Sequence, residues 1–360
     1  MEVNGLSQRN KFVRNALIAV SVSLATIFLL GFFMRGAELG KKIQHFSIFE
    51  SLSYFLIFSI VFVIDSFRTV IISHFLGERF PFSKALENSL LGYFFAYVTP
   101  FSAGGQPFQI YHLAKSGMKS ENASAVILTR WSNMLIFLSV SSLLFTYKYL
   151  KYVKTGISAL DKLVWVIIAG SVFVSVMIVF SLLVPTVGKF VVSLLKRLKI
   201  SALYRFFFHR NFEDEIEKFS NWLNKFYSSI RKIWIHQPLL VILDMSLGIL
   251  DFAIIFYVLY KAIVFSSALS ETPFRLTFID LSAIYILLSF IVYYIPTPGA
   301  AGGVEGGFFA VLSRYGSKTA VMRGILMWRI STYYYTILLG LFILFVAYGR
   351  GDLFDGRAKL

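Results

Sequence analysis

The sequence has no cysteine and little charge. The absence of Cys among its 360 residues excludes disulfides, thiolate metal sites and cysteine nucleophiles. Charged residues make up 15% of the chain and hydrophobic residues 57%, with a mean hydropathy of +0.71. A soluble domain averages about 25% charged residues, so this chain has too little polar surface to cover a water-facing fold. Most of it must face lipid.

Long apolar runs determine how the chain crosses the bilayer. A helix crosses a hydrocarbon core of ~30 Å with about 20 apolar residues, whereas a transmembrane strand needs alternating polarity. The runs here are continuous. They predict an all-α polytopic integral membrane protein with about eight transmembrane helices. The expected spans are 16–33 (uncleaved, because no small-x-small cleavage site follows it), 52–76, 84–99, 122–147, 163–184, 238–265, 276–295 and 318–348.

A basic stretch separates two membrane regions. Residues 186–237 hold ten Lys or Arg against four acids, with apolar residues between them. This pattern is typical of an amphipathic segment on a membrane surface, and its charge predicts the cytoplasmic face. We therefore expect a multi-pass protein of the cell (cytoplasmic or inner) membrane with a first membrane region at 1–185, the basic segment at 186–237, a second membrane region at 238–348 and a polar tail at 349–360. The net charge of +16 is attributed to contact with anionic lipids and not to nucleic acid.

Two Gly- and Pro-containing breaks resemble each other. Residues 97–105 read Tyr-Val-Thr-Pro-Phe-Ser-Ala-Gly-Gly, and residues 295–303 read Ile-Pro-Thr-Pro-Gly-Ala-Ala-Gly-Gly. Each break is followed by an arginine, which lies 30 residues after Pro100 in the first copy (Arg130) and 31 after Pro298 in the second (Arg329). Shared landmarks in the same order indicate an internal duplication, as in many transporters.

Breaks of this kind are expected to form a substrate site. Proline removes an N–H and paired glycines permit unusual backbone conformations. In hydrocarbon, freed backbone groups must be satisfied by protein or by a water-filled cavity. A helix that restarts after the glycines would point N–H groups at an anion such as a lipid phosphate. The predicted substrate-binding residues are Thr99, Pro100, Gly104, Gly105, Gln106, Arg130, Pro296, Thr297, Pro298, Gly299, Gly302, Gly303, Glu305 and Arg329. The alternative is a pair of tight turns between spans.

The second break carries a family resemblance. Residues 296–305, with Leu312, Gly316 and the Trp328-Arg329 region, resemble the flippase-type membrane domain of the lysylphosphatidylglycerol synthases; Thr99 to Gln109, with Gly117, is similar to that family's first-half signature. The resemblance spans nearly the whole chain and implies lipid translocation. Ala300 stands where the family usually has glycine. Only a tail follows residue 348, so lipid aminoacylation by a fused transferase domain is not implied.

Ionisable residues inside the spans need partners or a task, because each costs roughly 2.5–3.5 kcal/mol on insertion scales. Asp65 and Arg68 lie three apart on one helix face and are expected to pair with each other. Asp244 and Asp251 lie seven apart on one face, and these four residues form a candidate polar path. Glu305, at the start of a predicted half-helix, is either a structural cap or a functional residue that receives a proton or contacts a cationic headgroup. The two arginines after the breaks either contact phosphate or reach to the interface.

The leading hypothesis is a flippase or scramblase that passes an anionic headgroup, phospholipid or polyprenyl-phosphate-linked, through a polar cavity between the repeats. No phosphate-loop ATPase motif is present. We expect no cofactor and, with five scattered His, no metal site. Membrane lipids are the expected partners. The rivals are an intramembrane enzyme acting on a lipid phosphate, and a non-transporting scaffold. The sequence leaves open whether the repeats are parallel or inverted, how the termini are oriented, and whether the chain forms a homo-oligomer or binds a partner enzyme.

Overall fold

The protein is helical throughout the described part of the chain. The computed structural model describes Ser21 and residues 48–153, 158–197, 212–292 and 295–349. Within these ranges one isolated β-bridge accompanies the helices. The expected first span, 16–33, and nearly all of the expected tail lie outside the described residues. The predicted fold class, an all-α polytopic membrane protein, is confirmed.

Five of the expected spans are long apolar helical segments. They contain candidate spans of 19 to 31 residues with mean hydropathies of 1.4 to 2.7, long enough to cross a bilayer. Proline sets two of their boundaries, because it suits the first helical turn but removes an interior N–H: Pro238 opens one helix and Pro185 follows the end of another. The segments are α3 (Ile48–Phe75), α6 (Ser120–Val153), α7 (Ser158–Leu183), α11 (Pro238–Ala268) and the continuous run α14 (Lys318–Arg329), η2 (Ile330–Tyr334) and α15 (Tyr335–Gly349).

The other two described spans are arms of helical hairpins. Helix α4 (Phe82–Val98, 17 residues) is followed by α5 (Gly105–Lys115), and α12 (Phe278–Val292, 15 residues) is followed by α13 (Gly303–Leu312). Helix α4 stops at Thr99 because a residue before proline favours extended backbone; its φ and ψ are −113° and 146°. We refer to α4–α5 as hairpin 1 and to α12–α13 as hairpin 2.

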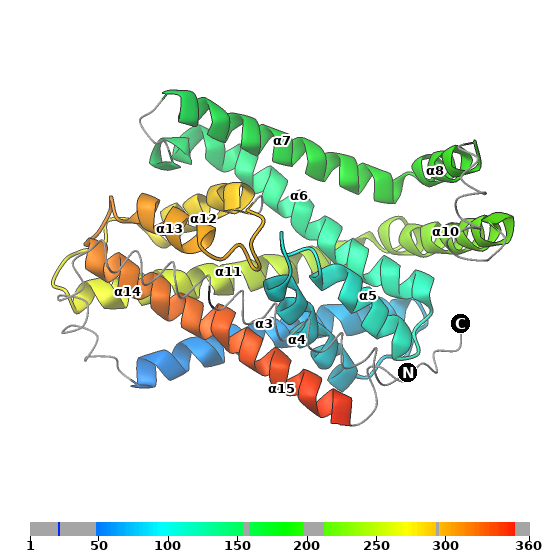
Figure 1. Cartoon of the computed structure of the whole chain (residues 1–360), viewed down its shortest axis with the longest axis horizontal. Helices are drawn as coiled ribbons and strands as arrows, with labels where there is room; N and C mark the ends of the chain where they lie inside the picture. The colour runs from blue at the N-terminus through cyan, green and yellow to red at the C-terminus, as the bar shows by residue number, and fades with distance from the viewer. Residues whose placement is uncertain (1–20, 22–47, 154–157, 198–211, 293–294, 350–360) are drawn as a thin grey trace.

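The two halves have opposite directions. In Figure 1, α3 runs from left to right and α11 from right to left; hairpin 1 enters from the right-hand end and hairpin 2 from the left-hand end. Helix α6, after hairpin 1, starts at the right, whereas α14, after hairpin 2, starts at the left. The units α3–hairpin 1–α6 and α11–hairpin 2–α14 are therefore inverted repeats, the arrangement known from many transporters.

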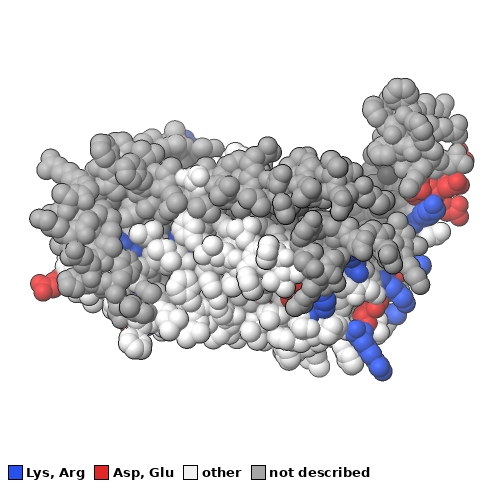
Figure 2. Space-filling model, turned by 60° about the horizontal axis from the view of Figure 1, so that its bottom comes forward, with Lys and Arg blue, Asp and Glu red and all other residues white. Residues whose placement is uncertain are grey.

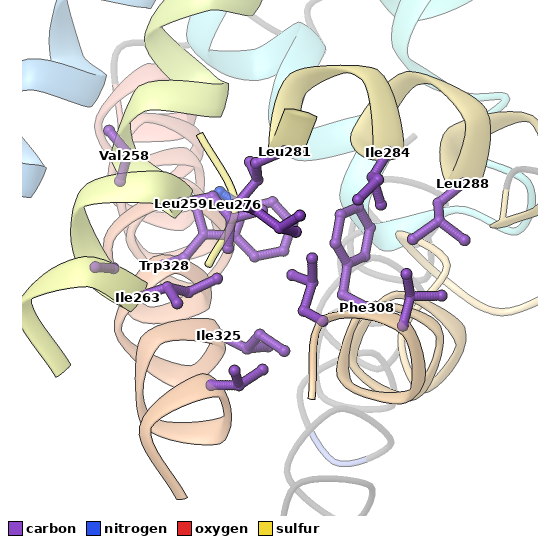
Figure 3. Close-up of a cluster of buried hydrophobic side chains, with 14 of the residues drawn as sticks. Val258, Leu259, Ile263, Leu276, Leu281, Ile284, Leu288, Phe308, Ile325 and Trp328 are labelled. Carbon is purple, nitrogen blue, oxygen red and sulfur yellow. The ribbon is translucent and has the colours of Figure 1, made fainter. Parts of the chain in front are cut away.

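The largest apolar cluster packs hairpin 2 against α11 and α14, the other helices of the second repeat. Phe308 of α13 faces Ile284 and Leu288 of α12, and Trp328 of α14 lies beside Ile263 of α11 (Figure 3). A Cβ on Gly324 would come within 2.6 Å of the Ile263 Cα atom, so this glycine is what allows α14 and α11 to pack so closely. Hairpin 2 is therefore built into the core.

Two amphipathic helices lie at one end of the molecule. Helices α8 (Pro185–Arg197) and α10 (Phe212–Trp234) occupy the right-hand end in Figure 1. They contact each other where Gly188 meets Tyr227, whose hydroxyl donates to the Ser181 carbonyl of α7 at 3.0 Å. Figure 2 shows a broad uncharged surface, with charged side chains gathered toward this end. This distribution is typical of a lipid-facing body with one polar end.

Candidate functional site: the junction of two broken helices

The two breaks meet. Pro100 and Pro298 form an isolated antiparallel β-bridge, although 198 residues separate them in the chain. Because the hairpins enter from opposite ends (Figure 1), their contact lies between the two ends of the molecule. The duplicated segments therefore form one structural unit and not two separate surface turns.

The first break is closed by Thr99. Its Oγ1 accepts a hydrogen bond from the Gly104 N–H at 2.9 Å and donates to the Phe95 carbonyl at 2.7 Å. A Cβ on Gly104 would lie 2.6 Å from the Thr99 Cγ2 atom, so only glycine fits beside this side chain. Phe101 and Ser102 adopt positive φ, 56° and 53°, which side-chain-bearing residues seldom do.

The second break turns through three residues with positive φ. These are Gly299 (58°), Ala300 (51°) and Gly302 (87°). A Cβ on Gly299 would come within 2.5 Å of the Tyr333 ring and 3.0 Å of the Tyr97 carbonyl, so this glycine lets hairpin 2 approach both hairpin 1 and η2. The Thr297 hydroxyl donates to the Ala301 carbonyl at 2.8 Å. The turn is thus fixed by its own backbone and by its neighbours.

Glu305 and Arg329 hold the second break in place. The Gly302 N–H donates to Glu305 Oε2 at 2.7 Å, and Arg329 Nε donates to Oε1 at 2.7 Å. Glu305 is fully buried and Arg329 is 4% exposed. The guanidinium carbon lies 3.9 Å from the centroid of the Tyr333 ring. Glu305 therefore acts as a cap and as an ion-pair partner, and it ties hairpin 2 to α14.

Arg130 lies in a separate buried network and not at the junction. It binds Asp65 and the Thr69 hydroxyl on α3. The expected pairing of Asp65 with Arg68 is wrong. Although the two residues share a helix, Arg68 points toward α11, where acidic partners across the bundle outcompete its own-helix neighbour.

Arg68 bridges the two acids of α11. Its Nε and Nη2 donate to both Asp244 oxygens, at 2.8 and 3.2 Å, and its Nη1 donates to Asp251 Oδ2 at 3.1 Å. Asn133 of α6 donates to Asp244 Oδ2 at 2.6 Å. A Cβ on Gly248 would lie 2.9 Å from Arg68 Nη2, so this glycine makes room for the guanidinium. We call Asp65, Arg68, Arg130, Asp244 and Asp251 the ion network.

The tips of the two hairpins differ in exposure and in charge. Pro100, Phe101 and Ala103 are exposed in hairpin 1, whereas Gly299, Ala300 and Ala301 are buried in hairpin 2. No acidic residue lies in the first turn of α5, while α13 has Glu305 there. Of the other predicted residues, Gly105 is buried at the start of α5, Gln106 and Gly303 are partly buried, and Pro296 is exposed.

Several contributing residues escaped sequence reasoning. Tyr97 and Tyr333 contact each other at the junction with tilted rings whose centroids are 5.0 Å apart. Asn88 Nδ2 donates to His112 Nδ1 of α5 at 3.2 Å, and His112 Nε2 lies 3.3 Å from Glu87 Oε1, so His112 ties α5 to α4. Aromatic residues and scattered His give no spacing signal in a chain this rich in apolar side chains. In the described ranges no three His, Cys, Asp or Glu side chains are grouped to share a metal ion.

Comparison with known proteins identifies the family of the chain. Comparison with curated proteins gave no match. The family profile of the lysylphosphatidylglycerol synthase TM region matches residues 17–340, which include both hairpins, the ion network and the Glu305–Arg329 pair. Because that match covers most of the sequence, the chain belongs to the family of the lysylphosphatidylglycerol synthase TM region.

Proposed function

We propose that the protein moves an anionic lipid headgroup, phospholipid or polyprenyl-phosphate-linked, across the membrane along the hairpin junction. Membership of a family named for a lipid synthase supports a lipid-related role in the membrane. Headgroup movement along the junction is supported by the meeting of two broken helices of an inverted repeat at Pro100 and Pro298. In transporters, such helices form the substrate site near the bilayer midplane.

The exposed tip of hairpin 1 supports a polar path. Non-helical backbone is tolerated at membrane depth only where protein covers it or water reaches it. At this tip, Pro100, Phe101 and Ala103 are exposed, and Phe101 has left-handed backbone. A segment of this shape between the two ends of the molecule suits contact with water or a headgroup better than contact with acyl chains.

The headgroup phosphate is assigned to the start of α5. A helix N-terminus attracts anions through its free N–H groups and its dipole. In both hairpins the N–H of the glycine before the second helix is already bonded, to Glu305 in hairpin 2 and to the neutral Thr99 hydroxyl in hairpin 1. The difference is one of charge, because Glu305 places a carboxylate at the start of α13. In α5 the equivalent third position is Pro107, and no acidic residue lies in the first turn. The two breaks therefore have different roles, with the anion bound by hairpin 1.

The two arginines that follow the breaks, Arg130 and Arg329, stabilise the helix packing around the path. Arg130 is held by Asp65 and Arg329 by Glu305, and all four side chains are buried. Phosphate contact by either arginine would require the lipid to displace its carboxylate. The arginines therefore act mainly by fixing the helices around the path.

The basic end is assigned to the cytoplasmic face of the cell membrane. Lys189 of α8 and Lys225 and Lys232 of α10 are exposed there, and Phe190 of α8 is 67% exposed. Exposed apolar and basic residues on one amphipathic helix favour binding to anionic lipid surfaces. This placement agrees with retention of Lys and Arg on the cytoplasmic side.

Reconstitution tests the proposal. The purified chain, in liposomes with labelled anionic and zwitterionic lipids, should move the anionic lipid faster than protein-free vesicles do. Pro107→Glu copies the acid of hairpin 2 into hairpin 1 and should slow this movement about tenfold, for a loss of ~1.4 kcal/mol in anion binding. Pro107→Gln is the matched neutral control and should retain the rate. No movement of any lipid class above protein-free vesicles would refute the proposal.

A further inference from the structure

The ion network contains more negative than positive groups. The carboxylates of Asp65, Asp244 and Asp251 surround the guanidiniums of Arg68 and Arg130, and each of the five residues is only 2% to 6% exposed. If all were ionised, one negative charge would have no counter-charge inside the network. A buried charge without a partner costs several kcal/mol even after relaxation. The network is therefore one positive charge short.

Asp251 is the carboxylate with the weakest pairing. Asp65 has Arg130 as its own partner. Asp244 accepts two bonds from Arg68 and one from Asn133. Asp251 accepts a single bond, from Arg68 Nη1 at 3.1 Å, and its Oδ1 is buried with no hydrogen-bond partner. The missing positive charge is therefore most needed at Asp251.

Two further acceptors in and beside the ion network have no donor. Asp65 Oδ2 on α3 and Asn133 Oδ1 on α6 are also buried without partners. Such groups are rare in native proteins and ask for an explanation. The charged and titratable groups that act on this site are Asp65 and Arg68 of α3, Tyr93 of α4, Arg130 of α6 and Asp244 of α11.

We propose that the ion network binds one proton, held by the Asp251 carboxyl, and that loss of this proton loosens α11 from α3. The proton comes from hydronium in the bulk solution, whose O–H bond breaks to leave water as the Oδ1–H bond forms. Oδ1 changes from an acceptor without a donor into an O–H that can donate. A metal ion fits less well, because the three Asp of the network are occupied by arginines and no three His, Cys, Asp or Glu among the described residues are grouped so that they could hold a metal ion.

Protonation of Asp251 determines how the stability of the fold changes with pH. A group that is neutral in the folded protein and ionised when unfolded stabilises the fold at low pH, and its contribution is lost as the pH rises. The folded wild type should therefore become less stable toward alkaline pH. Asp251→Asn mimics the protonated carboxyl and should remove this dependence.

Thermal unfolding of the purified full chain in lipid nanodiscs measures the effect. Between about pH 6 and about pH 9 the wild-type midpoint should fall by about 5 °C, while that of Asp251→Asn should stay level and match the wild type at the acidic end. Asp244→Asn is the control: it removes the doubly bonded partner of Arg68 and should lower the midpoint at the acidic end as well. A wild-type midpoint that falls no more than that of Asp251→Asn would overturn the proposal.

Infrared spectroscopy provides a readout that does not depend on how the variants fold. The wild type at neutral pH should show the carbonyl stretch of a buried protonated carboxylic acid, and Asp251→Asn should lack it. Absence of this band in the wild type would overturn the proposal, as would a midpoint restored at alkaline pH by Na⁺ but not by K⁺. None of these measurements involves lipid movement, so a failed lipid assay leaves the result intact. A role for this proton in driving transport would rest on the proposed function.

Discussion

Hairpins 1 and 2 share a sequence motif but differ in the burial and charge of their tips. Hairpin 2 is fixed by the buried Glu305–Arg329 pair and by Phe308 in the largest apolar cluster. Hairpin 1 also packs into the bundle, with α4 against α3 and α15 and α5 against α6, and Phe95 stacks on Phe108 at 3.8 Å between its arms, but its tip is exposed. The two similar breaks therefore have different environments: the break of hairpin 2 is part of the core, and the break of hairpin 1 is exposed.

Removing the acid of hairpin 2 should give the largest effect. Glu305→Ala leaves Arg329 buried without a counter-charge and the Gly302 N–H without its acceptor. We expect a loss of about 3–5 kcal/mol in the free energy of unfolding, measured by denaturant titration in detergent micelles. Pro107→Ala, at the equivalent position of hairpin 1, should cost under about 1 kcal/mol. Equal losses for the two variants would show that the hairpins are held alike.

A substitution at the contact between the two hairpin tips should give the second-largest loss in the free energy of unfolding. Gly299→Ala adds a Cβ that would lie 2.5 Å from the Tyr333 ring at a residue with a φ of 58°. Strain and overpacking together predict a loss of about 2–4 kcal/mol. Gly77→Ala is a matched control, since Gly77 also has positive φ (81°) but nothing within 4 Å of its added Cβ. It should lose only about 1–2 kcal/mol. The same unfolding titration compares them, and similar losses would mean that the contact between tips contributes little.

The smallest expected effect is a gain in stability. Ala300 adopts a φ of 51° in the second break, a conformation that costs a side-chain-bearing residue about 1–2 kcal/mol and glycine almost nothing. Ala300→Gly should therefore stabilise the protein by up to about 1 kcal/mol, after the extra chain entropy of glycine is subtracted. A rise of a few degrees in the thermal midpoint would show it. A lower midpoint would indicate that the Ala300 methyl group, which is 4% exposed, contributes more by packing than its backbone loses.

Much of the architecture could be predicted from the sequence. Continuous apolar runs locate the five long spans, and Pro100 and Pro298 locate the breaks, because both signals depend on short stretches of chain. The inversion of the repeats could not be predicted, since it depends on whether each break crosses the bilayer or turns back. The motif and its spacing also singled out Glu305 and Arg329. In the structure these two residues, 24 apart in the chain, form an ion pair.

The ion network was the part of the site that could be predicted least well from the sequence. Arg68 and Asp244 lie 176 residues apart in the chain, and their pairing depends on how α3 and α11 are rotated against each other. Sequence spacing reports which residues share a helix face, but it does not report which neighbouring helix that face meets. For that reason the pairing of Asp65 with Arg68 looked reasonable and was wrong.

The meeting of the tips also has a consequence for the thickness of the permeability barrier. At 1.5 Å per residue, the 11 residues of α5 span about 16 Å and the 10 residues of α13 about 15 Å. Together these lengths match a hydrocarbon core of ~30 Å. The second arms of the two hairpins thus have the summed length of one membrane-crossing helix. On the proposed path along the junction, a headgroup from either side would meet a helix end after about half the usual depth.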